Sequence, residues 1–203
     1  MDQTDYTTKD ELAKLLSKLP VAVGHSVINE SLLQLSVSDF FRKILFDGSP
    51  ISLETIYKER GELNVKSTEW QPAGEGETHE GMPVLESKTY ELEVQIKGNP
   101  FVKKAPTKRT AKIIERSAEK LHLRIVTKTS SVPYCDCFYV EEEWFVVQAK
   151  QAAKSCGFRV SYTVTFVQST MMKGMIKSST DGESKAFWQA WNQIITEKGF
   201  EFV

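Results

Sequence analysis

The chain has 203 residues, and its 26 basic and 27 acidic side chains leave a formal net charge of −1 at pH 7. This balance excludes a protein that binds nucleic acid mainly through bulk positive charge, although a local basic patch remains compatible with it. Hydrophobic residues make up 40% of the chain and charged residues 26%. Since a domain of roughly 200 residues buries close to 70% of its unfolded surface, we expect a folded chain with a sizeable core.

Cysteine usage and hydropathy bear on the compartment. The three cysteines lack disulfide-type spacing and no charged-then-apolar leader begins the chain, so we expect a reducing, cytoplasmic location. The longest apolar runs, such as Trp144–Val147, hold only a few residues. A bilayer span needs roughly 20, so the expected membrane contact is peripheral.

The first predicted element is a short helix. Thr8–Glu11 has the form of a capping box, Pro20 ends the segment, and one helical face carries Leu12, Leu15, Leu16 and Leu19. We expect residues 1–20 to form a helical appendage and residues 21–203 to form a single domain.

An extended segment and two short helices follow. The chain is extended from Val21 to Leu35, and apolar residues then recur at helical spacing from Ser36 to Phe46. Asp47–Pro50 breaks that helix. A second helix begins near Leu53 and ends near Gly61, a residue type that readily adopts the left-handed conformation closing helices.

After Gly61 the hydrophobic period changes from 3.6 to 2 for about a hundred residues, which is typical of an antiparallel meander. Glycine and proline cluster in the gaps at 71–83 and 98–106, where we expect mobile loops. Six strands are predicted: Glu62–Trp70, Leu85–Ile96, Thr107–Ala118, Leu121–Ser130, Phe138–Lys150 and Phe158–Gln168.

The C-terminal segment returns to helical period. Thr180–Glu183 is a second capping box, and one face beyond it carries Phe187, Ala190, Trp191 and Ile194. A long curved sheet must bury its concave face, and this helix is the candidate of sufficient size. The predicted class is α+β: a curved seven-stranded antiparallel sheet around a long C-terminal helix, with two short helices after the first strand.

Strand alternation and the helical face predict which side chains point inward. This pattern does not separate a filled core from a hollow one. The inward set is Tyr90, Leu92, Val94, Ile96, Leu123, Ile125, Val160, Tyr162, Val164, Phe166, Phe187 and Trp191.

Local motifs resemble one family. The most specific are the Ser131–Phe138 turn, which contains Val-Pro-Tyr, and the Met-Lys-Gly segment within Thr170–Ile176. Leu35–Gly48, the Glu69-Trp70 pair and Lys88–Leu92 add to them. The chain resembles VASt domains, the StAR-related modules of GRAM-domain sterol transporters and plant GRAM proteins.

This resemblance implies a helix-grip fold around a lipid cavity, lined by the inward set above, with a sterol as the favoured ligand. It implies lipid transfer without catalysis or cofactor, and a monomeric domain within a larger GRAM-containing protein that acts at contacts with the endoplasmic reticulum. One hydrogen bond would orient a sterol hydroxyl, and Tyr90, Gln95 and Tyr162 are the candidate donors by position.

The loop after Ile96 combines apolar and basic side chains. Phe101 and Val102 could insert into a membrane while the neighbouring cations meet anionic head groups. The cations are Lys103, Lys104, Lys108 and Arg109. The resemblance implies a lid in this place, and the alternative is a loop whose phenylalanine folds into the core.

Other motifs give weaker indications of function. Cys135 and Cys137 lack a second Cys or His pair, so no metal site is predicted. Of Glu141–Glu143, alternation turns only Glu142 inward, and an enzyme acting on a small hydrophobic molecule would need such a group. A protein-interaction module with a filled cavity is the main alternative to lipid transfer.

Overall fold

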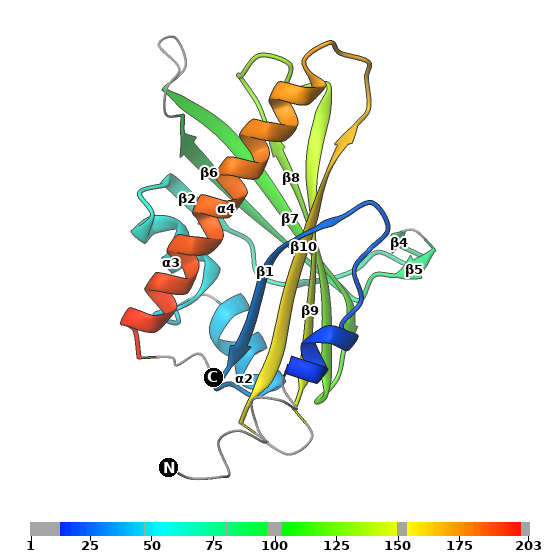
Figure 1. Ribbon diagram of the computed structural model, residues 1–203, viewed down its shortest axis with the longest axis vertical. Coiled ribbons are helices and arrows are strands. Elements are labelled where there is room, and N and C mark those ends of the chain that lie inside the picture. Colours follow the sequence, from blue (N-terminus) through cyan, green and yellow to red (C-terminus); the bar gives the residue numbers. More distant parts are fainter. Residues whose placement is uncertain (1–12, 47, 80, 97–102, 150–153, 200–203) are drawn as a thin grey trace.

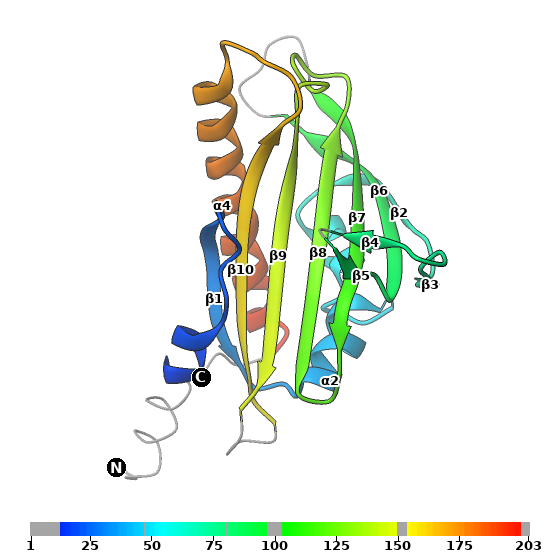
Figure 2. The ribbon, with the colours of Figure 1, turned by 90° about the vertical axis from the view of Figure 1, so that its right-hand side faces the viewer.

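A computed structural model describes residues 13–46, 48–79, 81–96, 103–149 and 154–199. An antiparallel sheet of eight strands curves around the long helix α4 (Lys173–Glu197), as Figures 1 and 2 show. This confirms the α+β helix-grip fold. The strand order is β1 (Ser26–Leu33), β10 (Cys156–Phe166), β9 (Phe138–Gln148), β8 (Lys120–Thr129), β7 (Lys104–Arg116), β6 (Glu86–Gln95) and β2 (Leu63–Ser67), and β3 (Gln71–Pro72) also pairs with β6.

Serine side chains begin the two short helices. Ser36 Oγ accepts a hydrogen bond from the Asp39 amide at 3.0 Å and caps α2 (Val37–Phe40), which continues as a π-helical turn, η1 (Phe41–Leu45). Ser52 caps α3 (Leu53–Glu59) in the same way, and Gly61 follows it with φ of +86°. Both predicted helices are confirmed. Each cap stabilises its helix because the serine oxygen accepts a hydrogen bond from a backbone amide that would otherwise lack a partner.

Helix α4 begins earlier than predicted. The expected start at Thr180–Glu183 is wrong, since the helix starts at Lys173 and spans 25 residues. The reason is packing: Ile176, in the first turn, joins an apolar cluster with Tyr162 and Val164. Asp181 does not cap the helix, because its carboxylate accepts a hydrogen bond from the Tyr162 hydroxyl at 2.8 Å.

The C-terminal half of α4 faces a filled aromatic core. The ring centroids of Trp144 and Trp188 are 5.1 Å apart, and Phe158 lies 5.6 Å from Trp188 and 5.5 Å from Trp191. All four side chains are buried. The inward faces of β9 and β10 are therefore closely packed against this half of the helix.

The N-terminal helix rests on the outer face of the sheet. Residues 13–18 are helical, and a Cβ added at Gly157 would lie 3.3 Å from both Leu15 and Leu16. Arg159 on β10 donates hydrogen bonds to the Leu16 and Leu19 carbonyls. The predicted capping box at Thr8–Glu11 lies outside the described residues, and the division at residue 20 stays a prediction.

The gap at 71–83, predicted to be a mobile loop, contains β3 and a small hairpin of β4 (Thr78–His79) and β5 (Met82–Pro83). Figure 2 shows this hairpin beside the outer face of the sheet. Its Glu77 carboxylate accepts a hydrogen bond from Lys112 Nζ of β7 at 2.8 Å. In the other gap, β7 begins at Lys104, and residues 97–102 lie outside the described part of the chain.

Candidate lipid-binding site

A cavity of about 250 Å³ lies between the strands β6–β9 and the N-terminal half of α4. Its lining includes Ile96, Thr129, Glu142, Ser184 and Phe187. Ligand pockets commonly hold about 300–1,000 Å³, so the cavity is slightly smaller than most of them.

Three of the twelve side chains predicted to contact lipid line this cavity: Val94, Ile96 and Phe187. The other nine do not line it and belong to the apolar clusters. The main core holds Tyr90, Leu92, Leu123, Ile125, Val160 and Trp191, and a second cluster comprises Tyr162 and Val164 with Phe166 packed against it. Lipid contact by these nine stays a prediction that requires the cavity to enlarge.

Arg109 is the main polar feature that the sequence interpretation misplaced. We expected it in the membrane loop, but its guanidinium points inward, with Cζ 4.9 Å from the Tyr57 ring centroid and 5.2 Å from that of Phe187. Nη1 donates a hydrogen bond to the Tyr57 hydroxyl at 3.2 Å. Buried Nε has no hydrogen-bond partner among the described residues. Alternation could have found this position, because Ala111 and Ile113 on the same face of β7 are buried.

Glu142 is an ionisable group inside the fold, as alternation predicted. Its carboxylate is buried and accepts a hydrogen bond from Trp144 Nε1 at 3.3 Å. Burial raises the pKa of Glu142, and the positive charge of Arg109 opposes that rise. A protonated carboxyl here could donate a hydrogen bond, and an ionised one could only accept.

A second arginine and carboxylate stand on the α3 side of the cavity. Arg60 Cζ lies 4.7 Å from the Phe187 ring centroid, and Arg60 Nη1 is 3.1 Å from Glu62 Oε1. Burial raises the pKa of Glu62, while the charges of Arg60 and Arg109 lower it. The lining thus combines apolar walls with a few charged groups, as is typical of sites that orient an amphipathic ligand.

The three candidate anchors have different surroundings. Gln95 lines the cavity and donates a hydrogen bond from Nε2 to the Gly61 carbonyl at 2.7 Å. The Tyr162 hydroxyl is bonded to Asp181, and burial raises its pKa to about 12. Tyr90 packs edge-on against Tyr57, with centroids 5.7 Å apart. Of the three, Gln95 is the one adjacent to the cavity.

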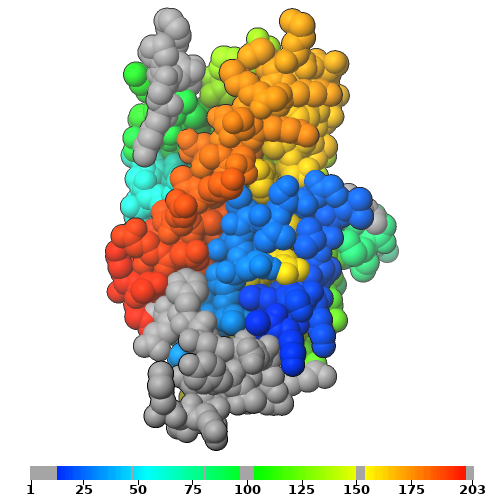
Figure 3. All heavy atoms as spheres, viewed as in Figure 1, coloured from blue at the N-terminus to red at the C-terminus, as the bar shows by residue number. Residues whose placement is uncertain are grey.

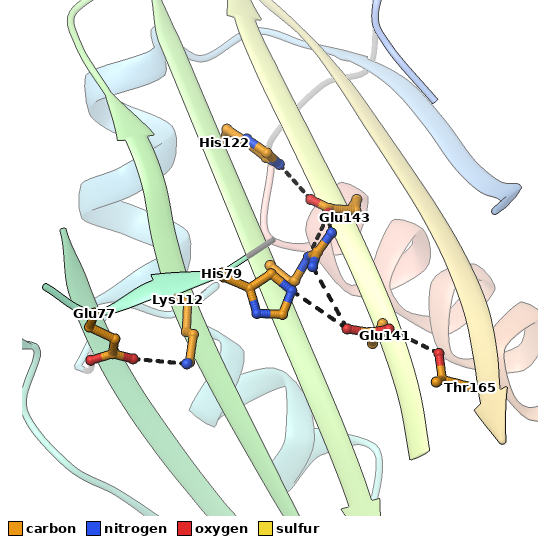
Figure 4. Close-up of polar contacts among 8 residues, drawn as sticks. Glu77, His79, Lys112, His122, Glu141, Glu143 and Thr165 are labelled. Atoms are coloured by element: carbon orange, nitrogen blue, oxygen red, sulfur yellow. Dashed lines mark hydrogen bonds and ion pairs between the residues drawn. The ribbon is translucent and has the colours of Figure 1, made fainter. Parts of the chain in front are cut away.

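The neighbours of Glu142 point to the opposite face and form a buried ionic network (Figure 4). Glu143 pairs with Arg124 and with His122, whose Nε2 lies 2.5 Å from the carboxylate. Glu141 accepts from Thr165 Oγ1 at 2.9 Å and lies 3.7 Å from His79 Nε2 of β4. These contacts hold the hairpin and the sheet together.

The described residues hold no group of three or more His, Cys, Asp or Glu side chains arranged to bind a metal ion. In the same part of the chain, no helix has the length and hydropathy required to cross a membrane.

Comparison with known proteins decides the family. The model of the VASt family, the VAD1 Analog of StAR-related lipid transfer domain, matches residues 27–182. The chain belongs to the VASt family. VASt domains are related to StAR-type lipid-transfer domains, and they form a lipid-binding family and not a family of enzymes. The match runs from β1 to the first part of α4 and contains every residue that lines the cavity except Glu183, Ser184 and Phe187.

A curated relative agrees with this assignment. The VASt chain is 27% identical over 173 residues to Protein VASCULAR ASSOCIATED DEATH 1, chloroplastic, of Arabidopsis thaliana. The aligned part covers 84% of this chain and 27% of that protein. The chain therefore spans about a quarter of the length of the relative.

Proposed function

We propose that this VASt domain binds a lipid, with a sterol as the favoured cargo, and transfers it between membranes. The observation that carries the proposal is the cavity of about 250 Å³ between the sheet and α4, in a member of a StAR-related family. Removing about 400 Å² of hydrocarbon from water contributes roughly 10 kcal/mol, so a shaped apolar space needs few polar contacts.

Cargo entry requires the cavity to enlarge, and the N-terminal half of α4 is the element best suited to move. It is held by the small cluster of Tyr162, Val164 and Ile176, whereas the C-terminal half packs its Trp188 and Trp191 against Trp144 and Phe158 of the sheet. Displacing the first half exposes less buried surface, so it costs less free energy.

In this proposal the polar groups at the cavity orient the cargo. Arg109 Nε is a donor available to a hydroxyl oxygen, and Glu142 and Gln95 lie on the same lining. Each of these groups could bind one end of an amphipathic molecule whose hydrocarbon fills the remaining space.

We further propose that the domain is a monomer within a longer GRAM-containing protein, cytoplasmic and peripheral to membranes. Lys103, Lys104 and Lys108, exposed at the beginning of β7, would meet anionic lipid. Phe101 and Val102, which would insert beside them, lie outside the described residues.

Sterol binding tests the proposal. The protein is titrated with a fluorescent sterol delivered from cyclodextrin, and transfer between liposomes is then followed. Ser184→Trp fills the cavity lining and should abolish binding, while Ser178→Trp, on an exposed position of the same helix, should leave it unchanged. Equal binding by both variants, or no binding by the native chain, would contradict the proposal.

A protein-interaction module is the second candidate, and the small cavity above a filled aromatic core favours it. Native mass spectrometry of protein purified from a eukaryotic host separates the two. A co-purified lipid supports transfer, and a consistently empty protein supports the interaction module.

A further inference from the structure

Large apolar side chains are exposed at one end of the sheet. Val167 and Met171, in the segment that joins β10 to α4, are 59% and 101% exposed, and Met175 in the first turn of α4 is 57% exposed. Tyr134, in the turn between β8 and β9, is 44% exposed. These four, here termed the tip surface, are among only nine exposed large hydrophobic residues in the described part of the chain. A contiguous exposed apolar patch commonly marks an interaction site.

Backbone hydrogen bonds join the two segments of the tip surface. The amides of Val167 and Gln168 both donate to the Cys137 carbonyl, at 2.9 and 3.3 Å. The Cys137 amide in turn donates to the backbone carbonyl of Tyr134 at 3.0 Å. Met172 turns inward and packs against the cluster of Tyr162 and Ile176. Met171 is therefore directed outward by an ordered segment and not by a loose one.

The charges around the tip surface are mostly positive. Segments 130–137 and 167–177 contain exposed Lys173 and Lys177 and a single acid, Asp136. Lys173 Nζ lies 5.2 Å from the centroid of the Phe166 ring, at the base of the segment. Apolar tips beside lysines match the interface of an anionic bilayer, where hydrocarbon and negative head groups lie within a few ångströms of each other.

The tip surface lies at the same end as the cavity. Strand register places Phe138 opposite Phe166, Thr129 opposite Thr107, and Gln95 opposite Lys104. The ends of these strands and the beginning of α4 meet at the upper end of the molecule in Figures 1 and 3. Val132, Ser179 and Thr180 of the cavity lining belong to the same region.

We propose that the tip surface inserts into anionic membranes, as a docking site separate from the basic residues at the beginning of β7. This inference rests on the proposed lipid transfer, since it places the cavity beside the bilayer. Methionine suits such a contact, because its flexible side chain adapts to disordered acyl chains.

Vesicle flotation tests the docking site without any cargo. The native chain should bind phosphatidylcholine vesicles containing phosphatidylserine, and Met171→Ser/Met175→Ser should reduce the partition coefficient about tenfold or more. Val23→Ser is the matched control, because Val23 is 102% exposed but lies before β1. Equal partition of the double variant and the control would overturn the proposal.

Depth-dependent quenching provides a second measurement. Tryptophan fluorescence of Met171→Trp should be quenched by brominated lipids when vesicles are added, and that of Val23→Trp should not. Unquenched Met171→Trp would overturn insertion, even if flotation were affected by misfolding.

Cargo binding separates this docking site from the proposed function. Met171→Ser/Met175→Ser should bind sterol from cyclodextrin like the native chain and transfer it between vesicles more slowly. A native chain that docks but binds no sterol would contradict the proposed function and leave docking intact. Loss of sterol binding in the double variant would overturn a docking-only role for the tip surface.

Discussion

Two adjacent glutamates of β9 have different surroundings and opposite pKa shifts, because a strand turns successive side chains to opposite faces. Glu142 points inward, where burial raises its pKa and Arg109 opposes the rise. Glu143 points outward, where burial acts to raise its pKa, but the bonds from His122 and Arg124 prevail and lower it. One carboxyl is therefore favoured in its protonated form by folding, and the other in its ionised form.

Replacing Glu142 and replacing Glu143 should therefore have opposite effects on how the folding stability depends on pH. Glu142 has a raised pKa, so it favours the folded state most below its ordinary value of 4.5, and this contribution is lost as the pH rises toward the folded pKa. Glu142→Gln should therefore gain stability relative to the native chain as the pH rises above the ordinary value of 4.5. Glu143→Gln should lose relative stability with rising pH, since the lowered pKa of Glu143 stabilises the fold above 4.5. Urea unfolding measures both, and slopes of the same sign would contradict the assignment.

Arg109 is the residue whose replacement should affect both stability and binding. Arg109→Gln removes the charge that opposes the rise in the pKa of Glu142 and the donor to Tyr57. We expect a loss of about 2 kcal/mol in unfolding free energy and about tenfold weaker sterol binding. Lys108→Gln is the control, since it is the exposed neighbour on the same strand. Native-like sterol affinity in Arg109→Gln would remove Arg109 from the site.

At the scale of elements, simple periodicity predicted most of the fold. The six strands after Gly61 were confirmed because apolar and polar residue types alternate along most of them, and the short helices because serines cap them. The start of α4 was missed, since Thr180–Glu183 fits a cap locally while Ile176 continues the helix through tertiary packing. The size of the cavity could not be predicted from the sequence. Alternation predicts the direction in which each side chain points, but not the space that the side chains leave between them.

The first two turns of α4 should be the less stable part of the helix. Ile176→Ala removes an anchor of the second cluster and should cost about 2 kcal/mol. Amide exchange should accelerate in residues 173–180 and change little near the tryptophans. Lys177→Ala, the exposed next residue, is the control. Uniform acceleration along α4 would show that the two halves open together.

At the scale of the whole molecule, a net charge of −1 conceals an uneven distribution. Exposed Lys103, Lys104 and Lys108 stand at the end that carries the tip surface, whereas acidic Glu75 and Glu77 belong to the segment beside the outer face. A transfer domain must leave one membrane to reach the next. Weak overall attraction with cations at one end allows both orientation and release.

Charge reversal at the cavity end should therefore slow transfer more than charge reversal elsewhere. Lys103→Glu/Lys104→Glu should reduce the transfer rate between anionic liposomes about tenfold, and the difference from the native chain should shrink as salt screens the head groups. Lys14→Glu/Lys18→Glu changes the net charge equally through exposed lysines of the N-terminal helix. Since that helix packs on the outer face of β10, the control should transfer at nearly the native rate. Equal slowing of both variants would mean that net charge, and not its position, governs the encounter with the membrane.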